Sequence, residues 1–347
     1  MMVLSACIIA RASGGDSLQR AVSSIRPFVD EVVLMWTTRE DRPPIEGVDV
    51  TAHFDGCNTQ VDCPLDSACK CKAGDLTDFS AARNRSFELA SGDLLTWIDS
   101  DDTLRGQGDL RGLYKEGARV LSPYEYAFDA SGRCTSRQYT DRVVARGTRW
   151  TEPVHNMLVF APGMKIEKSD AFVWRHERTP EGVKTSRERS LRILRHWEKT
   201  PRYQNDARFV YYLGRVHLDC GILGRASREL ERAFHLEADV DKRATIALDL
   251  ARCFTPKYAH HALPWAHKAL ELRPEWPSPW LACARAYHFT SRPEVARKFL
   301  LMGAQCAEAD TALFVDPTEV SWTTSLVFGT RSLPMASVEF AQPSPLS

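Results

Sequence analysis

The sequence predicts an α/β domain followed by an all-α domain built from repeated helices. Two patterns and the chain length carry this prediction. The first half alternates short apolar runs with helical patterns, whereas residues 185–310 show apolar side chains three and four positions apart almost throughout. At 347 residues the chain is long enough for two domains, each with its own hydrophobic core.

The N-terminal half opens with a strand, a helix and a second strand. Apolar runs at 3–10 and 31–35 flank a segment, 17–28, in which Leu18, Val22 and Ile25 recur at helical spacing. Such a unit pairs its strands in parallel through a right-handed crossover. Residues 48–54 supply a plausible third strand. The pattern therefore predicts a sheet that is at least partly parallel.

The most informative stretch is 94–104, an apolar run that ends in Asp99, Asp101 and Asp102. Ligands of open α/β sheets bind at the carboxyl ends of the parallel strands. Carboxylates so close together can bind one hard divalent cation, which in turn can hold a diphosphate. An acidic turn that caps a helix is the alternative explanation of the triplet.

A family resemblance extends from the helix before this strand. The chain reads Asp-Phe-Ser-Ala-Ala-Arg-Asn at 78–84, Ser-Gly-Asp at 91–93 and Leu-Leu-Thr-Trp-Ile-Asp-Ser-Asp-Asp at 94–102. This order resembles the family 2 glycosyltransferases of GT-A fold, which show an Ala-Arg-Asn helix, then Gly-Asp and a strand ending in Asp-x-Asp. The resemblance reaches from about residue 3 to 176. It implies a GT-A (Rossmann-like) mixed sheet domain over 1–184 that transfers a sugar, with inversion, from a UDP- or GDP-sugar.

The resemblance also implies roles for individual residues. Asp99 and Asp101 would approach the ribose and a Mn²⁺ or Mg²⁺ ion that neutralises the leaving diphosphate. Arg83 would lie near the donor and stabilise the developing negative charge, although a structural ion pair is an alternative for it. The implied donor-binding residues are Ala10, Arg11, Trp36, Arg83, Asn84, Asp99 and Ser100.

A later segment adds two histidines to the candidate metal ligands. Residues 149–156 read Arg-Trp-Thr-Glu-Pro-Val-His-Asn and resemble the Arg-Trp…Val-His-Glu segment of family members that carry helical repeats. The resemblance implies that His155 returns to the site as a metal or diphosphate ligand. His176, in Trp-Arg-His-Glu, is a second candidate ligand.

Two positions depart from the family. Trp36 stands where the family has an Asp that contacts the nucleotide base. Trp36 could stack on a base, or Asp41 could substitute for that Asp. The sequence therefore does not decide which nucleotide is bound. Asn156 stands where Glu is usual, so no base is available there. Glu152 and Asp141 remain as candidate bases for the acceptor proton.

Four cysteines cluster in an insertion at 57–72. Cys57, Cys63, Cys69 and Cys71 could bind a structural zinc ion, form disulfides or remain free thiols. Their spacing departs from paired Cys-x-x-Cys zinc motifs. All three states therefore stay open.

Residues 185–310 predict a helical domain that resembles tetratricopeptide repeats, whose period is about 34 residues. A plain helical bundle is the alternative. Stacked helix pairs form a concave surface that suits an acceptor protein or glycan, or a second copy in a homo-oligomer. Residues 311–347 are rich in Pro, Ser and Thr, which predicts a loosely ordered tail.

Composition excludes little but weighs against a membrane or nucleic-acid protein. The chain has 45 basic and 45 acidic residues, although 133–232 is locally basic and could bind an anionic acceptor such as a modified nucleobase in DNA. The sequence has no apolar run of the roughly 18 to 20 residues that a membrane span needs. The apolar start lacks a basic leader, so we expect a cytoplasmic protein. The rival hypothesis is a non-catalytic helical-repeat scaffold with a decayed transferase domain.

Overall fold

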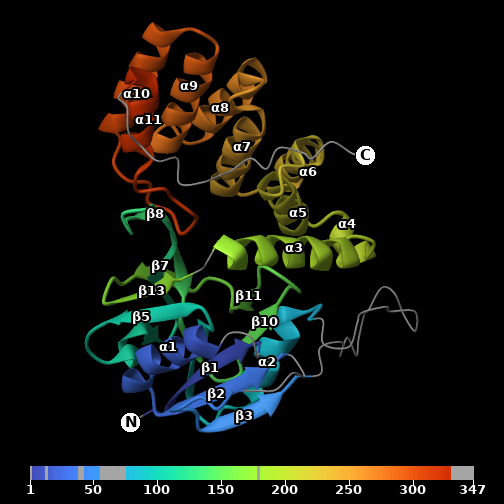
Figure 1. The fold of residues 1–347 in the computed structure, drawn as a ribbon, viewed down its shortest axis with the longest axis vertical. Coiled ribbons are helices and arrows are strands. Elements are labelled where there is room, and N and C mark those ends of the chain that lie inside the picture. Colours follow the sequence, from blue (N-terminus) through green and yellow to red (C-terminus); the bar gives the residue numbers. More distant parts are fainter. Residues whose placement is uncertain (1, 12–14, 38–42, 55–75, 178–179, 330–347) are drawn as a thin grey trace. The chain divides into compact units, whose positions relative to one another are not determined.

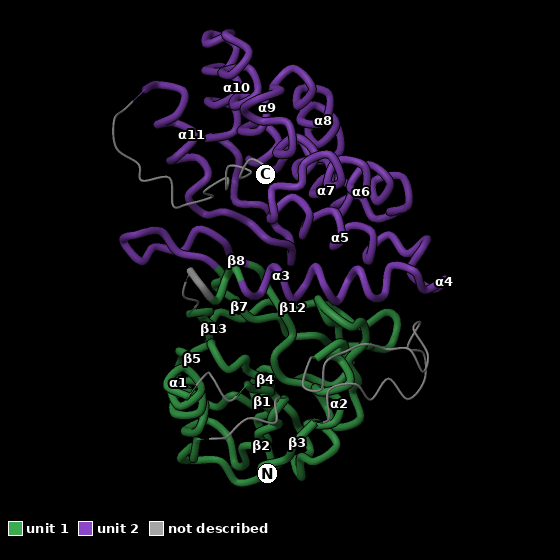
Figure 2. The backbone as a smooth tube through the Cα atoms, turned by 45° about the vertical axis from the view of Figure 1, so that its right-hand side comes forward, with its two compact units in different colours: residues 1–126, 138–184 green, residues 127–137, 185–347 purple. Residues whose placement is uncertain are grey.

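The computed structural model describes residues 2–11, 15–37, 43–54, 76–177 and 180–329 (Figure 1). Asp41 and the Cys57–Cys71 cluster lie outside these residues. The chain forms two compact units, with residues 1–126 and 138–184 in unit 1 and residues 127–137 and 185–347 in unit 2 (Figure 2). No helix among the described residues is long and apolar enough to cross a membrane.

Unit 1 contains a five-stranded sheet in the order β3-β2-β1-β4-β9. Strands β1 to β4 run parallel and β9 is antiparallel to β4. Their bounds are β1 Leu4–Ala10, β2 Glu31–Trp36, β3 Val50–His53, β4 Leu94–Asp99 and β9 Val143–Ala145. The predicted strand–helix–strand start is therefore present, in a mixed α/β unit.

Helices α1 (Gly15–Ile25) and α2 (Phe79–Leu89) pack on opposite faces of this sheet. Side chains alternate along a strand, so neighbours in sequence face opposite sides. Ile8 lies in the core cluster that contains the α1 side chains, whereas Cys7 lies in the cluster that contains Phe87 of α2. Both faces of the sheet are therefore buried.

A second sheet of six strands lies mostly in unit 1. Its order is β12-β7-β13-β5, and β6 and β8 also pair with β7. A separate pair, β10 and β11, is antiparallel. The bounds are β5 Asp102–Gly106, β6 Tyr114–Lys115, β7 Ala118–Phe128, β8 Cys134–Asp141, β10 Arg149–Thr151, β11 Met157–Val159, β12 Lys165–Lys168 and β13 Phe172–His176. Short 3₁₀ helices lie at Arg26–Phe28 and Leu110–Leu113.

The chain passes directly from one sheet to the other at two places. After β4 it turns at Ser100 and Asp101 and enters the second sheet as β5, and at Arg142 it leaves β8 and enters the first sheet as β9. The sequence predicted a strand that ends at the carboxylates of residues 99–102 but neither of these crossings, because residues buried in either sheet show the same apolar pattern.

Unit 2 consists mainly of helices. Most of α3 belongs to it, and α5/α6, α7/α8 and α9/α10 form successive packed pairs. The bounds are α3 Pro180–Trp197, α4 Pro201–Gln204, α5 Ala207–Asp219, α6 Leu223–Leu236, α7 Val240–Phe254, α8 Ala259–Leu272, α9 Pro277–Phe289 and α10 Pro293–Gln305. The pairs begin at 207, 240 and 277, close to a period of about 34 residues. The prediction of a helical-repeat region is confirmed.

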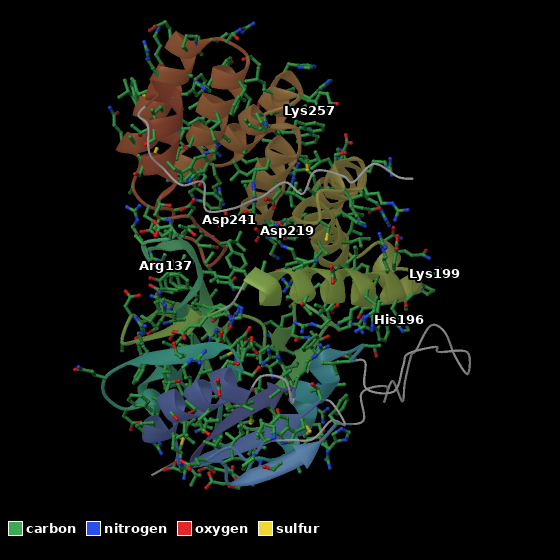
Figure 3. The ribbon with its side chains drawn as sticks, viewed as in Figure 1. Arg137, His196, Lys199, Asp219, Asp241 and Lys257 are labelled. Atoms are coloured by element: carbon green, nitrogen blue, oxygen red, sulfur yellow. The ribbon has the colours of Figure 1, made fainter. Side chains whose placement is uncertain are left out.

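The segment after residue 310 is more ordered than its composition predicts. Residues 319–328 form α11 (Glu319–Phe328), and Val327 packs in a core cluster with Leu281 and Leu300. Val315 exchanges backbone hydrogen bonds with Arg137, in the part of β8 that belongs to unit 2 (Figure 3). Apolar burial and strand pairing thus order a segment whose Ser and Thr content predicted a tail. Residues 330–347 lie outside the described part.

Candidate functional site

The predicted donor site lies at the carboxyl edge of the first sheet. Strand β1 has β2 on one side and β4 on the other, so the strand order reverses between β1 and β4. Asp99 ends β4 and pairs in register with Ile9, next to Ala10 at the end of β1. Open α/β sheets bind ligands at such a point. Arg11 follows directly and is partly exposed, and Ser100 lies in the turn after Asp99.

Trp36 also ends its strand at this edge, but its side chain is buried. It is 2% exposed and packs in the core cluster that contains Leu34 and α1. Its position two residues after Leu34 places it on the same inner face of the sheet. The ring therefore presents no exposed face on which a base could stack in this structure.

Helix α2 places Arg83 against Asp99. Asp78 caps the helix by accepting a hydrogen bond from Ala81 N at 3.1 Å, which fixes where the helix begins. Arg83 Nη2 then donates to Asp99 Oδ1 at 2.5 Å. Burial alone would raise the pKa of Asp99, but the positive charges around it, Arg83 foremost, hold it below its ordinary value. Asp99 is therefore a carboxylate at neutral pH.

Two indole rings enclose the Arg83 guanidinium. It lies 4.6 Å from the ring centroid of Trp97 and 4.9 Å from that of Trp150. Asn84 holds the second ring in place, because its side chain donates to Trp150 O at 3.0 Å and accepts from Trp150 N at 2.8 Å. Asn84 thus ties α2 to the backbone of β10.

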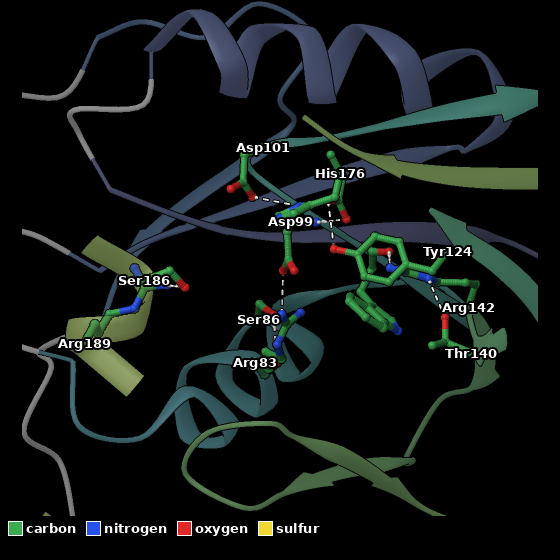
Figure 4. A network of polar contacts seen from close by, with 12 residues as sticks. Arg83, Ser86, Asp99, Asp101, Tyr124, Thr140, Arg142, His176, Ser186 and Arg189 are labelled. Atoms are coloured by element: carbon green, nitrogen blue, oxygen red, sulfur yellow. Dashed lines mark hydrogen bonds and ion pairs between the residues drawn. The ribbon is translucent and has the colours of Figure 1, made fainter. Parts of the chain in front are cut away.

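Asp102 belongs to a buried polar network with Tyr124 and His176, two residues that Figure 4 labels. Its side chain is fully buried. It accepts a hydrogen bond from the Tyr124 hydroxyl at 3.1 Å, and its Oδ1 lies 2.5 Å from His176 Nδ1. The ring of Tyr126 stacks on His176, with centroids 5.2 Å apart. Burial raises the pKa of Asp102.

Asp101, Asp102 and His176 form the one group of three or more metal-ligating side chains found in the described residues. Their ligand atoms lie within 4.8 Å of one another, and Asp101 Oδ1 is 3.6 Å from His176 Nδ1. Two carboxylates and an imidazole suit Mn²⁺, which accepts both oxygen and nitrogen ligands, better than Mg²⁺. Asp101 is partly exposed, so the group is open on one side.

The predicted metal set is thus brought together only in part. Asp101 and His176 are in the group, Asp102 takes the place expected of Asp99, and Asp99 pairs with Arg83. His155 is not in the group. It lies in a turn between β10 and β11 in which both His155 and Glu152 have positive φ, 53° and 73°. Such backbone is strained for residues other than glycine and is frequent at functional sites.

The two candidate bases differ in their surroundings. Asp141 accepts two hydrogen bonds from Arg119, at 3.0 and 2.6 Å, so its carboxylate is already engaged in an ion pair. Glu152 is partly exposed in the turn just described, and the backbone of that turn is held by Asn156, which donates to Glu152 O. Asn156 therefore supports the turn that carries Glu152.

Sequence reasoning did not find Tyr124 and Arg142. Arg142 is fully buried beside Tyr124, Trp97 and Trp174. The available signal was a charged residue directly before the apolar pair Val143 and Val144, although a surface arginine gives the same pattern.

Comparisons with known proteins do not assign a family. No family model matches the chain, and no curated protein matches it. Solved structures similar to part of it include MamA (16% identity, 36% of this chain and 74% of that chain), a kinesin light chain-like repeat protein of Podosopora anserina (18%, 36% and 66%) and PilF of Pseudomonas aeruginosa (18%, 37% and 57%). Each has a TM-score of 0.31, too low to support an argument about this chain.

Proposed function

We propose that the chain is a metal-assisted glycosyltransferase that uses a nucleotide diphosphate sugar, a UDP- or GDP-sugar. One observation carries the proposal: at the β1/β4 edge, the Asp99–Arg83 pair lies next to the Asp101–Asp102–His176 group. This edge of the sheet carries carboxylates that could hold a metal ion and, beside them, a buried guanidinium. A metal ion and an arginine can both stabilise the negative charge of a diphosphate leaving group.

The residues would divide the work as follows. Asp101, Asp102 and His176 would hold Mn²⁺ or Mg²⁺, which supplies charge neutralisation for the leaving diphosphate. Arg83 would contact an oxygen of the nucleotide sugar. Its guanidinium is held in one position because it lies between two indole rings and donates a hydrogen bond to Asp99. Glu152 is the better candidate base, because Asp141 is already engaged by Arg119.

The acceptor, whether protein, glycan or modified nucleobase in DNA, stays a prediction, as do a cytoplasmic location, a homo-oligomer and a structural zinc ion. A steep loss of duplex DNA binding with rising salt would favour the DNA acceptor. Sugar transfer to a protein or glycan would leave binding to DNA weak.

The test is binding of UDP and GDP with and without Mn²⁺, followed by mass spectrometry of a panel of nucleotide sugars. The proposal expects a thermal shift that needs both nucleotide and metal, and slow donor hydrolysis. Asp101→Ala should remove both effects. Asp170→Ala, at an exposed carboxylate bonded to Tyr139, is the matched control and should leave both unchanged.

A non-catalytic helical-repeat scaffold is the second candidate. The successive helix pairs of unit 2 favour it, since stacked pairs are a common protein-binding architecture. A protein that shows neither a nucleotide-dependent nor a metal-dependent shift would fit this candidate and exclude the first.

A further inference from the structure

Arg142 lies where the chain passes from the second sheet into the first. Its side chain is fully buried. The guanidinium carbon is 3.8 Å from the ring centroid of Trp97, 4.4 Å from that of Tyr124 and 5.0 Å from that of Trp174. These rings belong to β4, β7 and β13, so Arg142 contacts strands of both sheets.

Among the described residues, no carboxylate is in contact with this buried cation. Arg142 Nε donates to Thr140 Oγ1 at 3.0 Å and Nη1 donates to Trp97 O at 3.4 Å, while Nη2 has no partner in the described part of the chain. Every other fully buried charge is expected to be paired, because desolvating an ion is costly. Burial lowers the pKa of Arg142, and the charges that oppose this include Asp102 and Asp99.

The nearest concentration of negative charge is the acidic site. Asp99, Asp101 and Asp102 lie within four consecutive positions, and Arg83 bonds only the first of them. The Tyr124 ring lies against Arg142 and its hydroxyl donates to Asp102. Arg142 is thus a second positive charge near the acidic group, separated from Asp102 by the side chain of Tyr124.

We propose that Arg142 is a built-in counter-cation that stabilises the acidic group when no metal is bound. The inference rests on the metal site of the proposed function. Arg142 and a divalent cation then act on the same carboxylates, and the two positive charges repel each other. By linkage, removing the Arg142 charge should weaken the metal-free fold and tighten metal binding.

The experiment compares Mn²⁺ affinity, measured by electron paramagnetic resonance, and melting temperature with and without Mn²⁺. Arg142→Gln removes the charge but can still donate hydrogen bonds, and Arg142→Lys keeps the charge. We expect Arg142→Gln to melt lower without metal, to bind Mn²⁺ at least about fivefold more tightly and to show a larger Mn²⁺-induced shift. Arg142→Lys should keep the wild-type affinity.

Arg146→Met is the control for loss of charge alone, since Arg146 is exposed and its side chain donates to the Ser91 carbonyl. It should match the wild type in both measurements. Equal or weaker Mn²⁺ binding by Arg142→Gln overturns the inference, and so does a variant that fails to fold even in Mn²⁺, because its role is then structural. A wild-type protein that binds no Mn²⁺ refutes the proposed function itself.

Discussion

Adjacent aspartates of the acidic group should behave differently when each is replaced by alanine. Asp101 is 37% exposed, whereas the side chain of Asp102 is fully buried and contacts Tyr124 and His176. Asp101→Ala removes a solvated carboxylate. Asp102→Ala leaves a hydroxyl and an imidazole without their buried acceptor.

The expected sizes follow from these contacts. Leaving a buried polar group without its hydrogen-bond partner costs about 1–3 kcal/mol of unfolding free energy for each group, because the group stays desolvated. A partly exposed pair such as Asp101–His176 contributes less than about 1 kcal/mol. We therefore expect Asp102→Ala to destabilise unit 1 several-fold more than Asp101→Ala, while both lose Mn²⁺ binding.

Hydrogen exchange read by mass spectrometry suits this test, because a two-unit chain need not unfold in one step. Asp102→Ala should lose amide protection in β5 and β13, which are paired to each other at Asp102 and His176. Asp101→Ala should retain that protection. Normal protection in Asp102→Ala, or wild-type Mn²⁺ affinity in Asp101→Ala, would refute the reasoning.

Three further predictions concern stability. Burial and two nearby arginines lower the pKa of His217 to about 4. As the pH falls from about 6.5 to 4, the unfolded chain therefore takes up a proton on His217 before the folded chain does, and unit 2 should lose stability. In urea denaturation, His217→Leu should make the unfolding free energy of unit 2 depend less on pH over this range. A Cβ at Gly214 would lie 2.8 Å from Leu230, so Gly214→Ala should cost about 1–3 kcal/mol by denaturant melting, whereas Gly224→Ala, with open space, should be neutral or stabilising. Asn84→Ala should cost about 1–3 kcal/mol and raise hydrogen exchange in β10.

The spacing of apolar residues predicted much of the fold, because it indicates which side of each strand or helix is buried. It predicted the first strands of unit 1 and the helices between residues 185 and 310. Leu34 and Trp36 show that the same rule also predicts which side chains are buried. Strand alternation places both on one inner face, so the burial of Trp36 was accessible from the sequence.

Other features depend on contacts between distant segments. The sequence does not show that the chain changes sheets at Asp101 and at Arg142, because either sheet buries its residues equally. It therefore could not show that Asp102 turns inward to His176, 74 positions away, while Asp99 turns to Arg83. The helix at 319–328 was missed because its Ser and Thr residues favour loops until a packed neighbour is present.

The most direct test of the central proposal is a calorimetric titration of the full chain with UDP and GDP in the presence and absence of Mn²⁺. The proposal predicts that one nucleotide binds only with Mn²⁺ and that Asp101→Ala abolishes the binding while the protein stays folded. Metal-independent binding, or binding that survives Asp101→Ala unchanged, would contradict it.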